Sequence, residues 1–243
     1  MLDVLEFLAE TRDGFTLATL SRRLRVPKSS LLALLRTFVD RRYLEQPEPG
    51  GAYRLGPRAA QLGLRPAAER ELPEAAAPVL RDLAERTGES VFLGVLAPDS
   101  REVVYIARVE SRHRLRYTAD LGERRPLHCS APGLAILALL PEAERARLAA
   151  TLPLRPYTRA TVTDRDRLRA RLDDIRRAGV AVTVDEFIVG ATGVAAPVLD
   201  RDGAVRAACT VIGPTSRVQP QREAIVRAVK AAADRISRAL GAG

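Results

Sequence analysis

Residues 17–35 have the sequence LATLSRRLRVPKSSLLALL and set the architecture of the first part of the chain. Thr16 can cap a short helix that begins at Leu17, and Pro27 suits the first position of the next helix. The apolar residues of this next helix recur at intervals of three and one, as expected for a buried helical face. They are Leu31, Leu34, Leu35 and Phe38. Because only a few residues separate the two helices, the spacing indicates a helix-turn-helix.

The flanking segments extend this motif to a winged helix-turn-helix. An apolar helical stripe precedes it and should stop near Gly14; it consists of Leu2, Val4, Leu5, Phe7 and Leu8. Two short strands are predicted after it, at Tyr43–Glu45 and Ala52–Leu55, with turn residues at 47–51 between them. Three helices followed by a β-hairpin form a winged helix-turn-helix, which we place at residues 1–57.

The charge of the chain points to a polyanionic partner. Its 243 residues include 39 Lys and Arg and 30 Asp and Glu, for a net charge of +9. Residues 17–44 carry seven basic residues against Asp40 alone. Five Tyr, five Phe and no Trp argue against a protein that stacks single-stranded bases. Double-stranded DNA is therefore the expected partner.

A winged helix places its third helix in the major groove of DNA, which selects the candidate contacts. The start of this helix, at Lys28 to Ser30, favours a phosphate group, and Leu32 offers an apolar surface to a thymine methyl. Arg54 would contact DNA from the wing. A solvated protein surface remains the alternative for each residue. The DNA-binding candidates are Arg22, Arg23, Lys28, Ser29, Ser30, Leu32, Arg36 and Arg54.

Composition excludes several classes of protein. With 47% apolar and 28% charged residues, the chain is an ordinary folded protein rather than a disordered, collagen-like or coiled-coil one. The longest uncharged stretch, Pro126–Pro141, has 16 residues and is too short to span a membrane. Asp3, Glu6 and Glu10 stand where a signal peptide needs basic residues, so a cytoplasmic location is expected. Two Cys and two His do not favour a metal site, and no cofactor is expected.

The segment from Gly56 to Gly88 is predicted to be helical. We take residues 58–73 as a linker and residues 74–243 as a second domain. Within Glu74–Thr87 an apolar face forms, and Gly88 suits the helix end. This face could be a dimer seam or could pack against its own domain. It consists of Val79, Leu80, Leu83 and Ala84.

The second domain alternates strands and helices, which predicts an α+β architecture. Turns are expected at residues 99–100 and 202–203. Helices are predicted from about Gly133 to Leu140, from a Thr163 cap to just before Gly179, and from near Pro220 to the end. The predicted strands are residues 90–96, 103–109, 115–119, 180–184, 194–199 and 207–212.

A catalytic role is a competing interpretation of residues 128–130. His128 and Cys129 are neighbours at an expected strand end, so their side chains point to opposite faces and cannot form a nucleophile–base pair. Ser130 could be a nucleophile only with His113 within hydrogen-bonding reach. The simpler interpretation makes Ser130 a helix cap, so we do not expect an enzyme. Another alternative is a ligand sensor whose DNA-binding module has degenerated, since Leu32 and Ala33 are apolar.

Motifs along nearly the whole chain resemble the IclR (isocitrate lyase regulator) family of bacterial transcription factors. They are LDVLEFLAE at 2–10, the helix-turn-helix at 17–35, YRLGPRAAQLG at 53–63, ERTGESVFLGVL at 85–96, PLHCSAPGLAILALLP at 126–141, RRAGVAVTVDEF at 176–187 and GVAAPVLDRDG at 193–203. The resemblance implies a GAF-like effector-binding domain with an antiparallel sheet, behind the winged helix. It also implies dimers or dimers of dimers, and control of operator binding by a small organic molecule, often a carboxylate.

The resemblance places the effector pocket between the helix that follows Ser130 and nearby strand ends. The candidate residues are Ser130, Ala131, Pro132, Gly133, Thr183, Asp185, Gly193, Thr210 and Ile212. Thr183 and Gly193 stand where family members typically have an acid and a cysteine. We expect the start of the helix to attract an anionic head, and Gly193 to leave extra volume for an apolar body. An aromatic or branched-chain carboxylate fits this description, whereas an empty, well-packed core is the alternative.

Overall fold

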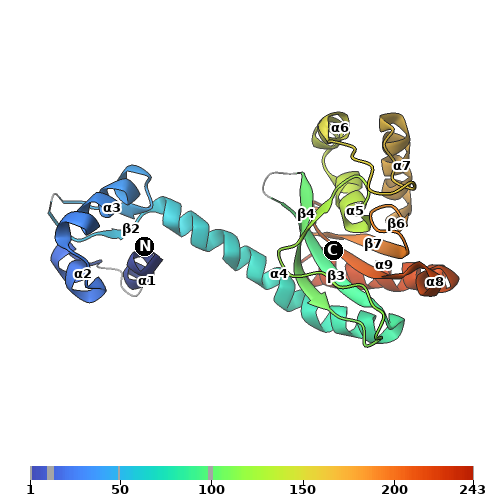
Figure 1. The fold of residues 1–243 in the computed structure, drawn as a ribbon, viewed down its shortest axis with the longest axis horizontal. Coiled ribbons are helices and arrows are strands. Elements are labelled where there is room, and N and C mark those ends of the chain that lie inside the picture. Colours follow the sequence, from blue (N-terminus) through green and yellow to red (C-terminus); the bar gives the residue numbers. More distant parts are fainter. Residues whose placement is uncertain (1, 10–13, 49, 98–100, 243) are drawn as a thin grey trace. The chain divides into compact units, whose positions relative to one another are not determined.

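The computed structural model describes residues 2–9, 14–48, 50–97 and 101–242 of the chain. It divides into two compact units, residues 1–71 and 72–243 (Figure 1). Helix α4 (Pro57–Thr87) runs without interruption from the first unit into the second. No helix among the described residues is long and apolar enough to cross a membrane.

The first unit is a winged helix-turn-helix, as predicted. It contains α1 (Leu2–Ala9), α2 (Leu17–Leu24), α3 (Lys28–Asp40) and the antiparallel pair β1 (Leu44–Glu45) and β2 (Arg54–Leu55). Thr16 caps α2, because its Oγ1 accepts a hydrogen bond from Thr19 N–H at 3.3 Å. Pro27 stands one residue earlier than predicted and is the N-cap of α3. The predicted stop of α1 near Gly14 falls on residues 10–13, outside the described residues.

Apolar faces of the three helices and the wing make one small core in this unit. Its buried members are Val4, Leu8, Leu20, Leu31, Leu35, Leu44 and Tyr53. The basic side chains Arg22, Lys28 and Arg36 of the two central helices stay exposed. Sequence periodicity alone therefore identified which face of α3 is buried and which is free for a partner.

The second unit is built on a six-stranded sheet in which every neighbouring pair is antiparallel. The strand order is β5-β4-β3-β8-β7-β6. The strands are β3 (Ser90–Leu96), β4 (Glu102–Val109), β5 (Arg124–Pro126), β6 (Ala181–Val184), β7 (Ala191–Leu199) and β8 (Val205–Pro214). The predicted α+β class of this domain is confirmed.

Helices cover both faces of the sheet (Figure 1). The second half of α4 and α9 (Arg222–Ala239) pack on one face. The other face is covered by α5 (Ala131–Leu139) together with α6 (Glu142–Thr151) and α7 (Arg165–Ala178). The short α8 (Thr215–Val218) and a 3-10 turn (Gln219–Gln221) connect β8 to α9. Burial on both sides explains the apolar character of β3, β7 and β8.

Several predicted elements of the second unit differ from the structure. Residues 115–119 are not a strand; Tyr117 O instead accepts a hydrogen bond from Ser90 Oγ, and the edge strand is β5. Helix α6 was not predicted, because within it only Leu148 and Ala149 are buried. The cap of α7 is Asp164 rather than Thr163, since its Oδ1 accepts from Arg167 N–H at 2.8 Å. The turn predicted at residues 99–100 lies outside the described residues.

The proposed dimer seam on α4 is wrong. Val79, Leu80 and Leu83 are 7%, 1% and 0% exposed, and they belong to the core of their own domain. This core also includes residues of β3, β7, β8 and α9. The apolar face of the helix is needed to cover the sheet, so none of it remains for a second chain.

Replacing Leu83 with Arg should therefore unfold the second unit rather than separate subunits. An unpaired charge and a longer side chain in a packed core should lower the free energy of unfolding by about 3 kcal/mol or more. Urea unfolding followed by circular dichroism measures this. Glu85→Arg, at an exposed position of the same helix, is the matched control and should change little. Equal stability of the two variants would contradict the packing described above.

Candidate functional site

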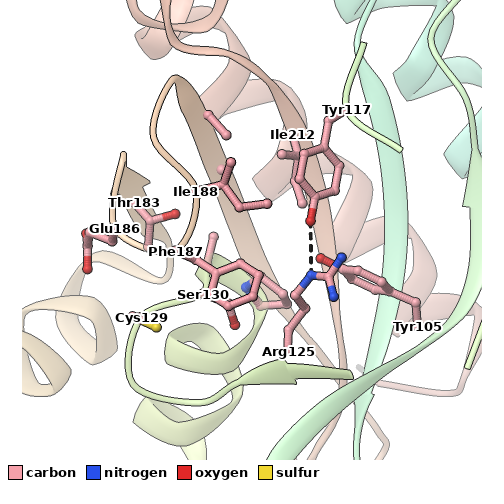
Figure 2. A pocket seen from close by; sticks show the side chains of 14 residues that line it. Tyr105, Tyr117, Arg125, Cys129, Ser130, Thr183, Glu186, Phe187, Ile188 and Ile212 are labelled. Carbon is pink, nitrogen blue, oxygen red and sulfur yellow. Dashed lines mark hydrogen bonds between the residues drawn. The ribbon is translucent and has the colours of Figure 1, made fainter. Parts of the chain in front are cut away.

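A cavity of about 350 Å³, counting its open mouth, lies in the second unit (Figure 2). One wall is formed by the start of α5, at Ser130 to Pro132. The sheet contributes Tyr105 of β4 and Gly193 of β7, with Ile212 of β8. The segment after β6 completes the wall with Phe187 and Ile188. Residues that are distant in the sequence are thus assembled around one space.

The start of α5 offers few donors to this cavity. Ser130 Oγ donates to Pro126 O at 2.6 Å and accepts from Gly133 N–H at 3.2 Å. Pro132 has no N–H, so Ala131 has the one uncapped N–H among the first three residues of the described helix. A helix start with a single free donor is a weak anion site compared with the usual three or four.

Six of the nine candidate effector residues line the cavity, namely Ser130, Ala131, Pro132, Thr183, Gly193 and Ile212. The other three do not. A side chain at Gly133 would point into the backbone of Leu127, at 2.6 Å. Asp185 Oδ1 accepts from Thr215 Oγ1 at 2.7 Å and from Gly190 N–H at 3.0 Å, which holds the loop. Thr210 is completely buried, and its hydroxyl has no hydrogen-bond partner in the described structure.

The expectation that Gly193 leaves extra volume is wrong. A Cβ atom at this position would stand 3.0 Å from Ala131 Cβ and 3.1 Å from Thr183 Oγ1. The space is already occupied because α5 packs directly on β7. Gly193 therefore permits a close approach of helix and strand, and a large residue there would disturb the fold as well as the cavity.

Arg125 is the principal lining residue that the sequence analysis missed. Its side chain is 6% exposed. Nε donates to Tyr117 Oη at 2.9 Å and Nη1 donates to Arg124 O at 2.8 Å, while Nη1 also forms an ion pair with Glu123 Oε1 at 2.8 Å. Burial by itself would lower the pKa of the guanidinium, but the Glu123 carboxylate and the two phenols outweigh it and raise the pKa. The group is a permanent buried cation.

Aromatic rings surround this cation. The Arg125 Cζ lies 5.3 Å from the ring centroid of Phe187, 5.4 Å from that of Tyr105 and 5.9 Å from that of Tyr117. Such distances allow cation–π attraction, which is strongest where water is excluded. In the sequence, residues 123–125 resemble an exposed charged turn. The one available signal was the alternation of side chains along a strand, which turns Arg124 and Arg125 to opposite faces.

The carboxylate at the cavity is neutralised by a separate cation. Glu186 is 7% exposed, and its two oxygens accept hydrogen bonds from Arg171 Nη1 and Nη2, each at 2.6 Å. Its backbone oxygen accepts from Thr161 Oγ1 at 2.6 Å. These bonds fix the segment that carries Phe187 into the cavity, where Tyr157 packs on its ring at 4.8 Å. Glu186 therefore does not cancel the charge of Arg125.

The geometry around residues 128–130 shows no nucleophile–base pair among the described residues. Burial raises the pKa of the Cys129 thiol to about 12, so the group is not a thiolate. His128 Nε2 bonds to Arg155 O at 3.0 Å, in a turn rather than at a strand end. His113 lies beside Gly88 at the end of α4. Nor do the described residues contain a cluster of metal-ligating side chains.

In the first unit, the candidate DNA contacts form an exposed basic surface. The exposed residues are Arg22, Arg23, Lys28, Ser29, Ser30, Arg36 and Arg54, whereas Leu32 is half-buried. The Arg23 guanidinium is placed over the rings of Phe15, at 4.9 Å, and Phe7, at 5.3 Å. It is thereby held against its own domain.

Both units match known protein families. Residues 1–48 match the IclR helix-turn-helix domain, and residues 66–238 match the C-terminal domain of the bacterial transcriptional regulator IclR. The chain belongs to the IclR family. As an IclR-family member it is a DNA-binding transcriptional regulator whose C-terminal domain binds an effector, which confirms the main sequence interpretation.

Among its relatives, the HTH-type transcriptional regulator XynR of Escherichia coli K12 is 32% identical over 241 residues, covering 99% of this chain and 95% of XynR. The transcriptional repressor IclR of the same organism is 30% identical, covering 91% of this chain and 81% of that protein. Among solved structures, Thermotoga maritima IclR has a TM-score of 0.68 at 25% identity, covering 99% and 96% of the two chains. An IclR homolog from Microbacterium hydrocarbonoxydans, complexed with 4-hydroxybenzoate, has a TM-score of 0.66 at 30% identity, covering 100% and 98%.

The buried His128 should make stability depend on pH. Burial lowers the pKa of its imidazole, so the folded protein holds it neutral while the unfolded chain takes up a proton near pH 6.5. The neutral imidazole of His128 therefore contributes fully to the free energy of unfolding above about pH 6.5. This contribution is lost as the pH falls below that value. Urea unfolding at a series of pH values between about 7.5 and 5 should show a steeper loss of stability for the wild type than for His128→Gln. Parallel curves for the two proteins would contradict this account.

Proposed function

We propose that the cavity of the second unit binds a small organic acid with an apolar body. The observation that carries this proposal is the buried Arg125. It is the one cation among the described residues that line the cavity, and the Glu123 carboxylate together with the phenols of Tyr117 and Tyr105 keeps it charged. Its ion-pair partner Glu123 is 45% exposed to water, so an anionic ligand beside the buried guanidinium adds further compensation of its charge.

The rest of the lining favours an apolar body on that acid. Phe187, Ile188 and Ile212 line the cavity (Figure 2). Ala131 and Pro132 add further apolar surface to its wall. The cavity measures about 350 Å³ only when its open mouth is counted, so the ligand is small. The related Microbacterium regulator was crystallised with 4-hydroxybenzoate, an acid of this class.

Thermal unfolding in the presence of acids and their esters tests the proposed effector class. We expect benzoate, 4-hydroxybenzoate or 3-methylbutanoate to raise the Tm by a few degrees, because a ligand at about 100 times its Kd adds ~2.7 kcal/mol of stability. The corresponding methyl esters, which lack the negative charge, should shift the Tm much less, and acetate should also have little effect. Equal shifts from acids and esters, or none from any acid, would overturn the proposal.

In the first unit, we propose that α3 enters the major groove of an operator, with Lys28, Ser29 and Ser30 at a phosphate and Arg36 along the groove. The exposure of these residues on one helix supports this placement. Arg22 and Arg54 are further candidates for the backbone of the DNA. Leu32 is half-buried and offers a smaller apolar surface than an exposed residue.

We propose further that the chain works as a dimer or a dimer of dimers, binding rather than converting its ligand, in the bacterial cytoplasm. A two-fold operator is read most simply by a two-fold protein. Because Val79, Leu80 and Leu83 are inside the core, the subunit interface uses other surfaces. The Ser130 hydroxyl is occupied by its hydrogen bonds to Pro126 and Gly133, which supports a binding role rather than a catalytic one.

The salt dependence of operator binding tests the DNA interface. The logarithm of the binding constant should fall with the logarithm of salt concentration by ~0.9 per phosphate contact. Lys28→Ala and Arg36→Ala should each reduce this slope by about one unit for every phosphate that the side chain binds. Fluorescence anisotropy on an operator selected from random DNA measures the slope. Arg147→Ala, which removes an exposed charge from α6, is the control. The interface is wrong if both helix variants match this control.

A further inference from the structure

Tyr105 carries a hydroxyl group that the folded chain does not use. Its side chain is 1% exposed, and Oη has no hydrogen-bond partner in the described part of the chain. The ring itself is well packed, since it stacks on Phe92 with centroids 4.6 Å apart. Buried polar atoms without a partner are rare in native proteins. An orphaned donor in a cavity wall therefore indicates a group that arrives from outside.

Arg125 presents a second unused donor beside the first. Its Nε and Nη1 are committed to Tyr117, Arg124 and Glu123, but among the described residues nothing accepts a hydrogen bond from Nη2. In Figure 2 a dashed line joins the guanidinium to the Tyr117 hydroxyl, and the hydroxyl end of Tyr105 reaches the same place. Two N–H bonds of a charged group are thus free at the place where the Tyr105 hydroxyl is also free.

Tyr117 adds a third donor. Because its oxygen accepts the hydrogen bond from Arg125 Nε, its own hydroxyl hydrogen remains available. Burial raises the pKa of both phenols, so each keeps its proton at neutral pH. Arg125 Nη2 and the two phenol hydroxyls thus offer three hydrogen-bond donors close together, with few free acceptors nearby. A ligand group that matches them is a negatively charged acceptor with several lone pairs, such as a carboxylate.

We infer that the carboxylate of the effector binds to Arg125 Nη2 and the hydroxyls of Tyr105 and Tyr117, and not to the start of α5. This inference rests on the proposed function and specifies it further. It makes Tyr105 and Arg125 the residues that distinguish acids from neutral ligands. The apolar body then extends toward Phe187, Ile188 and Ile212.

The surrounding charges are consistent with this orientation. Glu123 holds one side of the guanidinium but is itself 45% exposed, so water screens its charge. Glu186 lies at the cavity wall and is paired with Arg171. A carboxylate placed near Glu186 would meet a second negative group, whereas one placed at Arg125 meets donors. The single uncapped N–H of Ala131 at the start of α5 cannot compete with three.

Tyr105→Phe is the most informative variant. It removes the orphaned hydroxyl and leaves the ring, so the ligand-free protein should have the same or a higher Tm than the wild type. Isothermal titration with benzoate, 4-hydroxybenzoate and 3-methylbutanoate identifies the acid that binds the wild type best. For this acid the Kd of the variant should be about ten- to hundredfold higher than that of the wild type, because the variant lacks the hydrogen bond from the Tyr105 hydroxyl to the charged carboxylate. Tyr157→Phe removes a phenol hydroxyl outside the cavity and should bind the acid as the wild type does.

Arg125→Gln and Arg125→Lys extend the test. The Gln variant should bind the acid at least about a hundredfold more weakly, while any weak binding of the methyl ester should be unchanged. The Lys variant keeps the charge but not the planar pair of donors, and it should fall between wild type and Gln. Circular dichroism establishes that each variant is folded before titration, and Tyr105→Phe keeps the test valid if an Arg125 variant unfolds.

The outcomes separate this inference from the proposed function. If no acid binds the wild-type chain, the proposed effector class fails and the inference fails with it. If acids bind the wild type, and folded Tyr105→Phe and Arg125 variants bind them equally well, the effector class stands and the inference is wrong. Weaker binding of the acid alone, with the ester and Tyr157→Phe unchanged, supports the inference.

Discussion

The close packing of α5 on β7 is the contact on which the effector cavity depends. A Cβ at Gly193 would stand 3.0 Å from Ala131 Cβ, so β7 carries no side chain at the point where the start of α5 crosses it. This approach brings the start of α5 within reach of Thr183 and Ile212. The cavity lies beside the start of α5, at Ser130 to Pro132.

Burial on both faces of the sheet imposes the rest of the second unit. One face needs the second half of α4 and α9, and the other needs α5 with α6 and α7. The helix that continues from the winged-helix unit is therefore also a core element of the effector domain, through Leu80 and Leu83.

The two units place their basic side chains in different surroundings. In the winged helix, Lys28 and Arg36 are exposed and suited to a solvated polyanion, where each contact is weak and salt-dependent. In the effector domain, Arg125 is buried among rings, where a single contact with an anion is strong because water is excluded. In the roles proposed above, the same kind of charge serves long-range attraction in one unit and selective recognition in the other.

The sequence by itself determined the winged helix, the α+β class and most elements, because apolar periodicity and caps such as Thr16 and Gly179 are local signals. The resemblance to the IclR family, and not the residue pattern alone, pointed to the start of α5 and several strand positions as the wall of the pocket. The sequence did not indicate that the face of α4 at Leu83 packs inside its own domain, since an apolar stripe looks the same in a core and at an interface. Nor did it reveal Arg125 and Tyr105, which lie 20 residues apart on β5 and β4. Their meeting depends on strand pairing, and whether a charged side chain is buried depends on what the folded chain places above it. That is a property of the tertiary structure alone.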